Sequence, residues 1–345
     1  MGDSQPQALD SGGVNQNTLI ENGQVRTGIF SEPIILVHPS DFDFRTPLGK
    51  KQGPMARRMR YKQFHYLGGI SDNLIFGAAV ADLRYLCTGF YYVYDLKTGK
   101  ELRHTWRAPL SRRVKFSENP ETGSVSFGDE RNGIHVECAG GRRRLHVRRQ
   151  NQSVIDVSLE DSLPEIEPLR ICTRAGYTGW VYVRKTGGVH MQGRVDCELG
   201  QFDAGECLGH TDFSAGYMRP ETWWNWAFVS GTANGQALGI NVSCGVNETS
   251  YSENCYWLGG RLHLLPQTRF EFNPGDPMSE WRVHSDALAL SFKPAGVHTE
   301  HVNAGILASR FNQVYGRFEG SVRLPGLPEA VPGLQGFVED HYARW

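Results

Sequence analysis

The sequence lacks several features that would assign it to a common class. It has no run of 18 apolar residues, so no transmembrane helix is predicted. Its first residues, MGDSQPQALDSGG, contain neither the basic nor the apolar segment of a secretory signal. With 36 Lys and Arg against 37 Asp and Glu, it lacks the basic excess of a nucleic-acid-binding protein. No Walker A, Rossmann glycine, G-x-S-x-G or H-E-x-x-H motif occurs, which argues against nucleotide, serine-hydrolase and zinc-protease sites.

The cysteines do not form a recognisable framework. There are seven, an odd number, and no C-x-x-C motif brings two together. Cys197, Cys207 and His210 lack a fourth ligand at the usual zinc spacing. We therefore predict seven reduced thiols in a cytoplasmic protein, with no metal site and no cofactor.

Glycine and short β-type patterns are abundant. The chain has 40 Gly, and segments such as 61–70, 73–86 and 88–102 mix aromatic and β-branched residues between Gly and Asn turns. No amphipathic helix longer than about ten residues is indicated. The sequence thus predicts an all-β protein with less than about one fifth helix.

An arginine-rich segment, RRRLHVRR at 142–149, allows two interpretations. Five Arg in eight residues could form an anion site. The alternative is an exposed strand face or a sheet edge protected by charge.

Two constant offsets indicate an internal duplication. Residues 64–66 (FHY) resemble 224–226 (WNW) at an offset of 160, which also aligns Ala81 with Asn241. At an offset of 127, Gly193 aligns with Gly320, Gly209 with Gly336 and Asp212 with Glu339. We expect two β-barrel units, 30–215 and 216–345, after a flexible tail at 1–29. The junction is too short for a free hinge, so the units should share a large interface.

The first candidate site follows GHTD at 209–212. An acid, a tyrosine, an arginine and three tryptophans crowd into fifteen residues, which would suit an aromatic-walled pocket. Its candidate residues are Asp212 as an acid or base and Tyr217, Arg219, Trp224, Asn225 and Trp226 as substrate-binding residues. A Trp-rich core between the units is the alternative.

A second candidate segment begins at residue 241. Strand alternation places Asn241, Ser243 and Gly245 on one face, and Glu248 and Trp257 follow. Buried polar side chains need partners, so this face would suit a polar ligand. We take Asn241, Glu248 and Trp257 as substrate-binding candidates, unless the face is exposed to solvent.

The third candidate segment is the C-terminus, EDHYARW. Alternation puts Glu339 and His341 on one face, where a carboxylate and an imidazole could transfer protons. Alternatively, the two groups could satisfy each other where a barrel closes.

Four blocks carry a resemblance to known families: 78–94, 221–228, 316–320 and 339–345. They resemble a domain-of-unknown-function family, number 2804, over residues 30–345. More distantly, GHTDFSAGY followed by WWNWAF resembles the motif of carotenoid 1,2-hydratases and other double lipocalin-like proteins. This resemblance implies two calycin-type barrels and cofactor-free chemistry on hydrophobic substrates. It matches Asp212, Trp224 and Trp226 to the motif, whereas Phe213 and Ser214 replace its His and Asn.

These observations favour a cofactor-independent enzyme of hydratase, lyase or isomerase type, with Asp212, Glu339 and His341 as its acid–base groups. Two alternatives are a non-catalytic lipid or isoprenoid carrier and a glycan-active hydrolase or lyase with two carboxylates. The expected partner is a small-molecule, lipid or glycan ligand, not a nucleic acid. An enzyme pocket should gather carboxylates with shifted pKa values, whereas a carrier pocket should be apolar.

Overall fold

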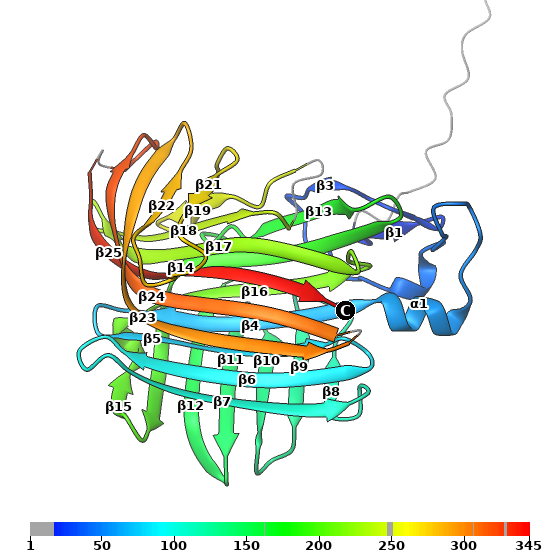
Figure 1. Cartoon of the computed structure of the whole chain (residues 1–345), viewed down its shortest axis with the longest axis horizontal. Coiled ribbons are helices and arrows are strands. Elements are labelled where there is room, and N and C mark those ends of the chain that lie inside the picture. Colours follow the sequence, from blue (N-terminus) through cyan, green and yellow to red (C-terminus); the bar gives the residue numbers. More distant parts are fainter. Residues whose placement is uncertain (1–16, 162, 247–250, 306, 328–329) are drawn as a thin grey trace, which may run out of the picture.

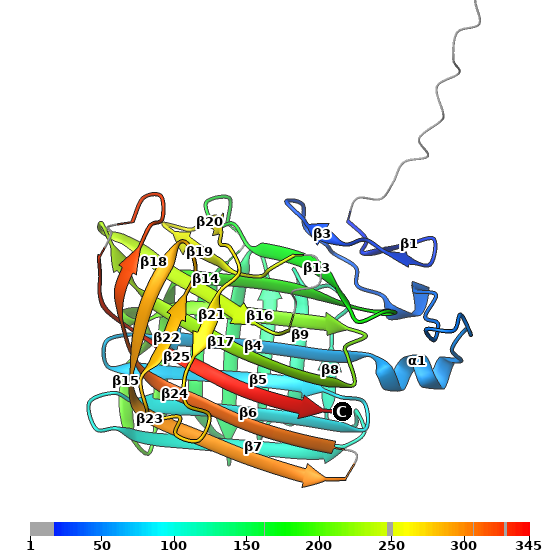
Figure 2. The ribbon, with the colours of Figure 1, turned by 45° about the horizontal axis from the view of Figure 1, so that its top comes forward.

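The computed structural model describes residues 17–345 except 162, 247–250, 306 and 328–329. Strands account for 64% of the residues and helices for 4%, which confirms the predicted all-β class. Two curled sheets, each a half-barrel, pack against each other (Figures 1 and 2). None of the seven cysteines, all of which lie in the described ranges, forms a disulfide, as predicted. No helix in the described ranges is long and apolar enough to cross a membrane.

The first sheet has a main path in the order β7-β6-β5-β4-β16-β14-β12-β11-β10-β9-β8. Its strands, all antiparallel, are β4 (Lys62–Ile70), β5 (Leu74–Asp82), β6 (Leu86–Asp95), β7 (Lys100–Pro109), β8 (Val114–Phe116), β9 (Gly123–Gly128), β10 (Gly133–Ala139), β11 (Arg142–Arg149), β12 (Gln152–Glu160), β14 (Gly179–Cys197) and β16 (Leu208–Gly216). Two side strands, β13 (Leu169–Ala175) and β15 (Gly200–Asp203), also pair with β14, and a 3-10 turn, η2 (Ala204–Glu206), precedes β16.

The second sheet has the order β20-β19-β18-β17-β25-β24-β23-β22-β21. Its strands are β17 (Glu221–Ala233), β18 (Gln236–Cys244), β19 (Cys255–Leu258), β20 (Arg261–Leu264), β21 (Arg269–Glu271), β22 (Trp281–His284), β23 (Leu288–Ala304), β24 (Leu307–Val322) and β25 (Ala330–Arg344). The chain passes from the first sheet to the second between Gly216 and Glu221.

An N-terminal arm lies at one end of the first sheet (Figure 1). It comprises β1 (Ile20–Glu21), β2 (Gln24–Val25), β3 (Gly28–Ile29), η1 (Pro39–Asp41) and α1 (Pro54–Arg60). Residues 17–29 are therefore not the flexible tail that the sequence predicted. Leu19 is fully buried, and β3 pairs with β13, because apolar side chains of the arm cover the first unit. Residues 1–16 lie outside the described ranges.

The strand orders of the two sheets correspond over nine strands, which supports the predicted duplication, whereas β9 and β8 at the end of the first sheet have no counterpart among the described strands of the second. In each sheet a four-strand meander, β4 to β7 or β17 to β20, begins beside the last strand of its sheet, β16 or β25. On the other side of that last strand follow β14 or β24, and then β12 or β23.

Residue pairing makes this correspondence specific. Asp212 of β16 pairs with Tyr66 on one side and Lys185 on the other. Glu339 of β25 pairs in the same way with Trp226 and Gln313. The offsets of 160 and 127 thus connect equivalent positions in β4 and β17 and in β16 and β25.

The offset of 160 fails beyond the first hairpin. Tyr66 pairs with Ala79, whereas the equivalent Trp226 pairs with Ser243, so the offset in the second strand is 243 − 79 = 164 and Ala81 does not correspond to Asn241. The cause is the longer β17–β18 hairpin, which adds four residues before the matching position. Constant offsets hold only as far as loop lengths agree.

Apolar side chains form a core inside each sheet and a third core between the sheets. The interior cores include Leu67 and Val80 in the first unit and Val229 and Val314 in the second. The intermediate core contains Tyr66, Trp226 and other large aromatic side chains from both units. Strands at this interface, such as β4, β5 and β16, are therefore buried on both faces, as expected when two units share an interface.

The units approach each other closely at a bulge in β14. An ideal Cβ built on Gly239 of β18 would lie 2.6 Å from the backbone nitrogen of Gly188, and one on Gly187 would lie 2.5 Å from the Phe228 ring. Neither Gly187 nor Gly239 has a positive φ, so close packing, not backbone conformation, requires glycine there.

We therefore predict that Gly239→Ala destabilises the protein. The added methyl group would push against backbone that cannot rotate away, and such overpacking typically costs 1–3 kcal/mol, that is, roughly a few degrees in Tm. Thermal unfolding measures the effect. The control is Gly53→Ala, where no atom lies within 4 Å of the new Cβ. Equal Tm values for the two variants would contradict this account of the interface.

Candidate functional site between the two units

The strongest candidate site lies at the interface between the sheets, where polar groups interrupt the aromatic core. Lys185 is buried and its Nζ lies 3.1 Å from Asp212 Oδ2 and 3.0 Å from Glu253 Oε1. Asp212 comes from the first unit, whereas Glu253 precedes β19 of the second. One ammonium group thus connects carboxylates of both units.

This cluster has fewer basic groups than acidic groups. One ammonium faces two carboxyl groups, and all three are shielded from water. Burial lowers the pKa of Lys185, but Asp212 and Glu253 outweigh it and hold that pKa above its ordinary value. Burial raises the pKa of Asp212, and Glu253 adds to this effect, whereas Lys185 and Ser214 oppose it. The cluster therefore favours an ionised lysine and a carboxyl group that binds protons more tightly than usual.

Asn241 and Trp226, both of which the sequence predicted to bind substrate, contact this cluster. Trp226 Nε1 donates to Asn241 Oδ1 at 2.8 Å, and Asn241 Nδ2 donates to the Glu253 carbonyl at 2.9 Å. Lys185 Nζ lies 4.8 Å from the centre of the Trp226 ring, within range of a cation–π interaction. The side chains of the cluster are thus fixed by several contacts each.

Glu339 occupies the equivalent position in the second unit but has no lysine beside it. Gln313, the counterpart of Lys185, donates from Nε2 to Glu339 Oε1 at 3.0 Å. Burial raises the pKa of Glu339 to about 8, although Arg103 and Lys185 oppose this rise. At neutral pH the Glu339 side chain is therefore mainly protonated.

A chain of hydrogen bonds crosses the interface beside Glu339. Gln313 Nε2 lies 3.3 Å from the Tyr92 hydroxyl, which lies 2.8 Å from the Tyr66 hydroxyl. That hydroxyl is 3.1 Å from His210 Nε2. Burial and Lys185 lower the pKa of His210 to about 3, so the imidazole is neutral. The Tyr66 ring fits here because residues 68 and 77 are glycines. A Cβ atom on either Gly68 or Gly77 would collide with the ring.

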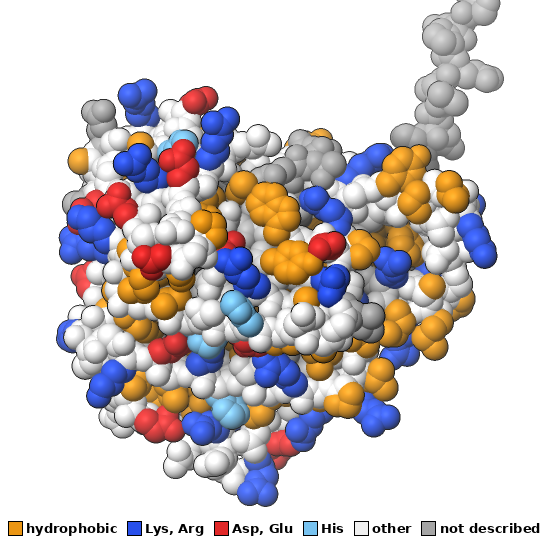
Figure 3. Space-filling view, in the orientation of Figure 1, with side chains coloured by type: hydrophobic (Ala, Val, Ile, Leu, Met, Phe, Trp, Pro, Cys, Tyr) orange, Lys and Arg blue, Asp and Glu red, His pale blue; other side chains and the backbone are white. Residues whose placement is uncertain are grey.

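An open groove leads from the surface towards this chain. It lies between β7 and β23, two strands that run side by side in Figure 2, and Arg103, Arg107, His298 and Glu300 contribute to its lining. Arg103 at its floor donates to Gln313 Oε1 at 2.5 Å and to the Tyr315 hydroxyl at 2.9 Å. Gln313 therefore connects the groove to Glu339. Figure 3 shows acidic, basic and histidine side chains intermingled on this face of the molecule.

Four residues predicted to bind substrate lie elsewhere. Tyr217 stacks on Phe44 under the N-terminal arm, and Trp257 donates to the Glu167 carbonyl. Arg219 Nη2 donates to the backbone carbonyls of Gly245 and Val246, so it is not the partner of Asp212; Lys185 is. Asn225 lies on the face of β17 opposite Trp226 and donates to the Glu339 carbonyl. Glu248 lies outside the described residues.

His341 is not paired with Glu339, contrary to the prediction. His341 Nε2 lies 3.0 Å from Ser309 Oγ, and its ring packs against Trp224 at a centroid distance of 4.1 Å. Burial lowers the pKa of His341 to about 3. Trp224 is partly buried and packs against the core between the two units. The two residues form an aromatic contact at one end of the interface.

Sequence reasoning missed Lys185, Gln313, Arg103 and Glu253. Lys185 carried a usable signal, because Val181, Val183 and Lys185 alternate along one strand face that is otherwise apolar. Gln313 could have been reached through the duplication as the residue opposite Glu339. Nothing local distinguishes Arg103 or Glu253 from surface charges.

The family comparison agrees with the fold. The family model described as "Domain of unknown function (DUF2804)" matches residues 13–345. The chain belongs to this family. Among curated proteins, none matches its sequence.

Two solved structures are similar to this DUF2804 protein, which confirms the double lipocalin-like fold. CghA, solved with Sch210972, has a TM-score of 0.52 and 10% identity, covering 95% of this chain and 97% of that chain. A Nitrosomonas europaea protein named AttH has a TM-score of 0.50 and 13% identity, covering 81% of this chain and 91% of that chain.

The raised pKa of Glu339 predicts a specific dependence of stability on pH. The unfolded carboxyl loses its proton near its ordinary pKa of 4.5, whereas the folded one keeps it up to about 8. The native state thus binds more protons in this window, and stability falls as pH rises through it. The loss should approach roughly 1.4 kcal/mol per unit of pKa difference.

Urea unfolding at several pH values tests this prediction. Glu339→Gln should lose less stability than the wild type between about pH 5 and 8, because glutamine does not titrate. Glu319→Gln, at a half-exposed acid whose pKa Lys293 holds below its ordinary value, should keep the wild-type slope in this pH range. Parallel curves for the wild type and Glu339→Gln would show that Glu339 titrates normally.

Proposed function

We propose that this protein is a cofactor-independent enzyme of hydratase, lyase or isomerase type that acts on a small organic or hydrophobic substrate. The units expected at 30–215 and 216–345 would share one site between them. The observation that carries the proposal is the pair of equivalent carboxyl groups, Asp212 and Glu339, in different protonation environments within an aromatic interface. Pairs of this kind are typical of acid–base catalysis.

Glu339 is proposed as the proton donor. Its carboxyl group keeps a proton at neutral pH, and a pKa near the working pH favours proton transfer in either direction. Gln313 donates a hydrogen bond to one carboxyl oxygen, and the Trp224 side chain also contacts this carboxyl group, so the group is held in place. In a hydration, this proton would pass to a carbon of the substrate double bond while water adds to the neighbouring carbon.

Asp212 is proposed as the complementary group that accepts the proton released by water. Its Oδ2 contacts Lys185, and Ser214 Oγ donates to its Oδ1 at 3.0 Å. The nearby ammonium limits the cost of burying the ionised form, while burial and Glu253 keep that form reactive towards protons. His341, which packs against Trp224, is better suited to shaping the aromatic wall.

The groove between β7 and β23 is the proposed route to the site. Arg103 links its floor to Gln313, so a substrate that displaces this contact would reach Glu339. CghA, whose fold this chain shares, was solved with Sch210972, which supports binding of an organic compound by this architecture. Trp226 and Tyr66 would supply apolar surface beside the reacting groups.

The carrier and glycan-active alternatives fit the interface less well. A carrier site should be apolar, yet four charged side chains, Lys185, Asp212, Glu253 and Arg103, converge here. A glycosidase needs two carboxyl groups facing an open cleft, whereas Asp212 and Glu339 are both buried.

Incubation of the full-length protein with a cellular metabolite extract, followed by untargeted mass spectrometry, tests the proposal. We expect depletion of a compound and formation of a product that differs by one water or is an isomer. Glu339→Gln should slow this conversion by roughly 100-fold or more, the usual contribution of a general acid. Asp212→Asn should also slow it severely.

The matched control is Glu319→Gln, which changes a half-exposed surface acid paired with Lys293 and should retain full activity. Unchanged conversion by Glu339→Gln would reject Glu339 as the proton donor. A compound that binds the wild type and is recovered unaltered, with no conversion anywhere in the extract, would favour the carrier function.

A further inference from the structure

The interior of the first unit contains a second polar region, on the other face of the sheet that carries Lys185. Strand alternation turns Lys185 of β14 towards the interface and Arg184 inwards. On the inner face, Arg184, Phe213 and His65 form one row across β14, β16 and β4. Tyr182, Ala215 and Gln63 form the next row.

A third row, with Trp180, Tyr217 and Tyr61, lies beyond these. The rings of Trp180 and Tyr217 lie 5.8 Å apart, and those of Tyr61 and Tyr217 lie 5.5 Å apart. Small Ala215 therefore sits at the centre of a ring of large aromatic and polar side chains. Phe42 and Phe44 of the N-terminal arm cover this end of the unit.

Four side chains in these rows bear buried polar atoms without a hydrogen-bond partner among the described residues. They are the hydroxyls of Tyr61 and Tyr182, Nε1 of Trp180 and both ring nitrogens of His65. Each of these residues is at most 2% exposed. Burial of a polar atom without a partner is unfavourable, so native proteins normally pair such atoms with protein groups, water or a ligand.

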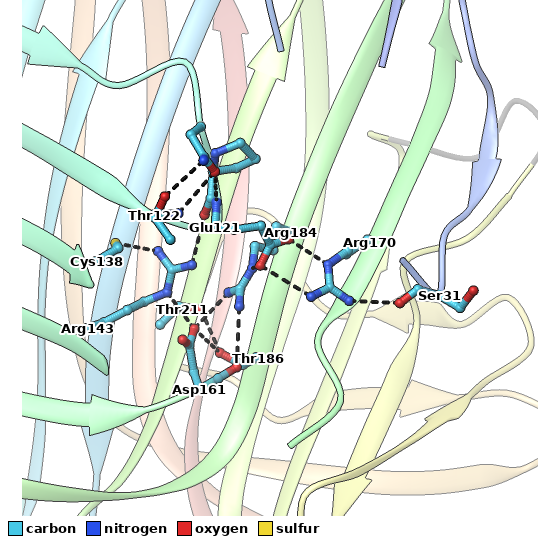
Figure 4. Close-up of polar contacts among 12 residues, drawn as sticks. Ser31, Glu121, Thr122, Cys138, Arg143, Asp161, Arg170, Arg184, Thr186 and Thr211 are labelled. Carbon is cyan, nitrogen blue, oxygen red and sulfur yellow. Dashed lines mark hydrogen bonds and ion pairs between the residues drawn. The ribbon is translucent and has the colours of Figure 1, made fainter. Parts of the chain in front are cut away.

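Figure 4 shows a buried network of charges, whose members act electrostatically on both His65 and Tyr182. Asp161 Oδ2 accepts hydrogen bonds from Arg143 at 2.5 Å and Arg184 at 2.7 Å. Glu121 contacts Arg170 at 2.6 Å and Arg184 at 2.8 Å. The described residues of the network thus comprise three guanidinium groups and two carboxylates. Arg143 belongs to the arginine-rich segment 142–149, and its side chain points into the first unit.

Charge and hydrogen-bonding capacity both indicate the same kind of ligand. The network carries one more positive than negative charge among its described members. Trp180 Nε1 can only donate, and tyrosine hydroxyls donate readily. Burial lowers the pKa of His65 to about 3, so the ring is neutral and donates from one nitrogen. Such donors beside a positive excess suit an acceptor with one negative charge.

We propose that the interior of the first unit, between the arginine network and the N-terminal arm, binds a small organic monocarboxylate. Tyr182, Trp180 and His65 donate hydrogen bonds to it, the aromatic rings contact its apolar part, and the arm closes over it. This site is separate from the interface site, because a whole sheet lies between the two. Its failure would leave the proposed enzymatic function untouched.

Calorimetric titration of the full-length protein with sodium acetate and with sodium benzoate tests the proposal. Sodium chloride at equal ionic strength is the reference. We expect saturable carboxylate binding, with benzoate tighter than acetate if the ligand is aromatic and equal or weaker if it is aliphatic. Tyr182→Phe should weaken binding at least about tenfold, because it removes one hydrogen bond to a charged acceptor. Trp180→Phe should act in the same direction.

Tyr94→Phe is the matched control. It also removes a buried hydroxyl without a partner, but from the core between the units, so carboxylate binding should not change. Absence of saturable binding, saturation by chloride in place of carboxylate, or equal affinities for Tyr182→Phe and the wild type would overturn the proposal. So would a crystal structure grown with benzoate in which these atoms contact only ordered water.

Discussion

The contact of Lys185 with Asp212 and Glu253 is the interaction on which the interface depends. It joins side chains of both units in a region otherwise filled by large aromatic residues. Loss of one partner from a buried ion pair typically costs about 3–5 kcal/mol, because the remaining charge stays unpaired. The contact therefore fixes how the two sheets meet and concentrates titratable groups where water is excluded.

Duplication explains why the two carboxyl groups differ. The rows Lys185–Asp212–Tyr66 and Gln313–Glu339–Trp226 are equivalent in strand order and register. The first row keeps a cation beside its acid, whereas the second has a neutral amide there. A buried acid with an amide partner retains its proton, while one with an ammonium partner can ionise. The residue at the position shared by Lys185 and Gln313 thus gives the two acids different protonation environments.

Much of this arrangement could be predicted from the sequence. Strand patterns revealed the all-β class, and the offsets of 160 and 127 matched Tyr66 to Trp226 and Asp212 to Glu339. The partners of the two acids were harder to predict. Lys185 lies beside Asp212 and Gln313 beside Glu339 only because of the register between neighbouring strands, which the sequence does not specify. Asn225 does not join Trp226 because neighbouring residues of a strand point to opposite faces, although both side chains are buried. Residues 17–29 show no strand signal in the sequence, because strands of two residues are too short to leave a local pattern.

The most direct test of the account is the titration of Glu339 itself. Carbon-13 NMR of protein labelled at glutamate carboxyls can follow each resonance with pH and assign this one by its loss in Glu339→Gln. The account predicts a carboxyl that titrates near pH 8, well separated from the exposed glutamates. If the Glu339 resonance titrated below about pH 5, as an ordinary glutamate does, the carboxyl would be ionised at neutral pH. The interface would then hold no proton donor at that position.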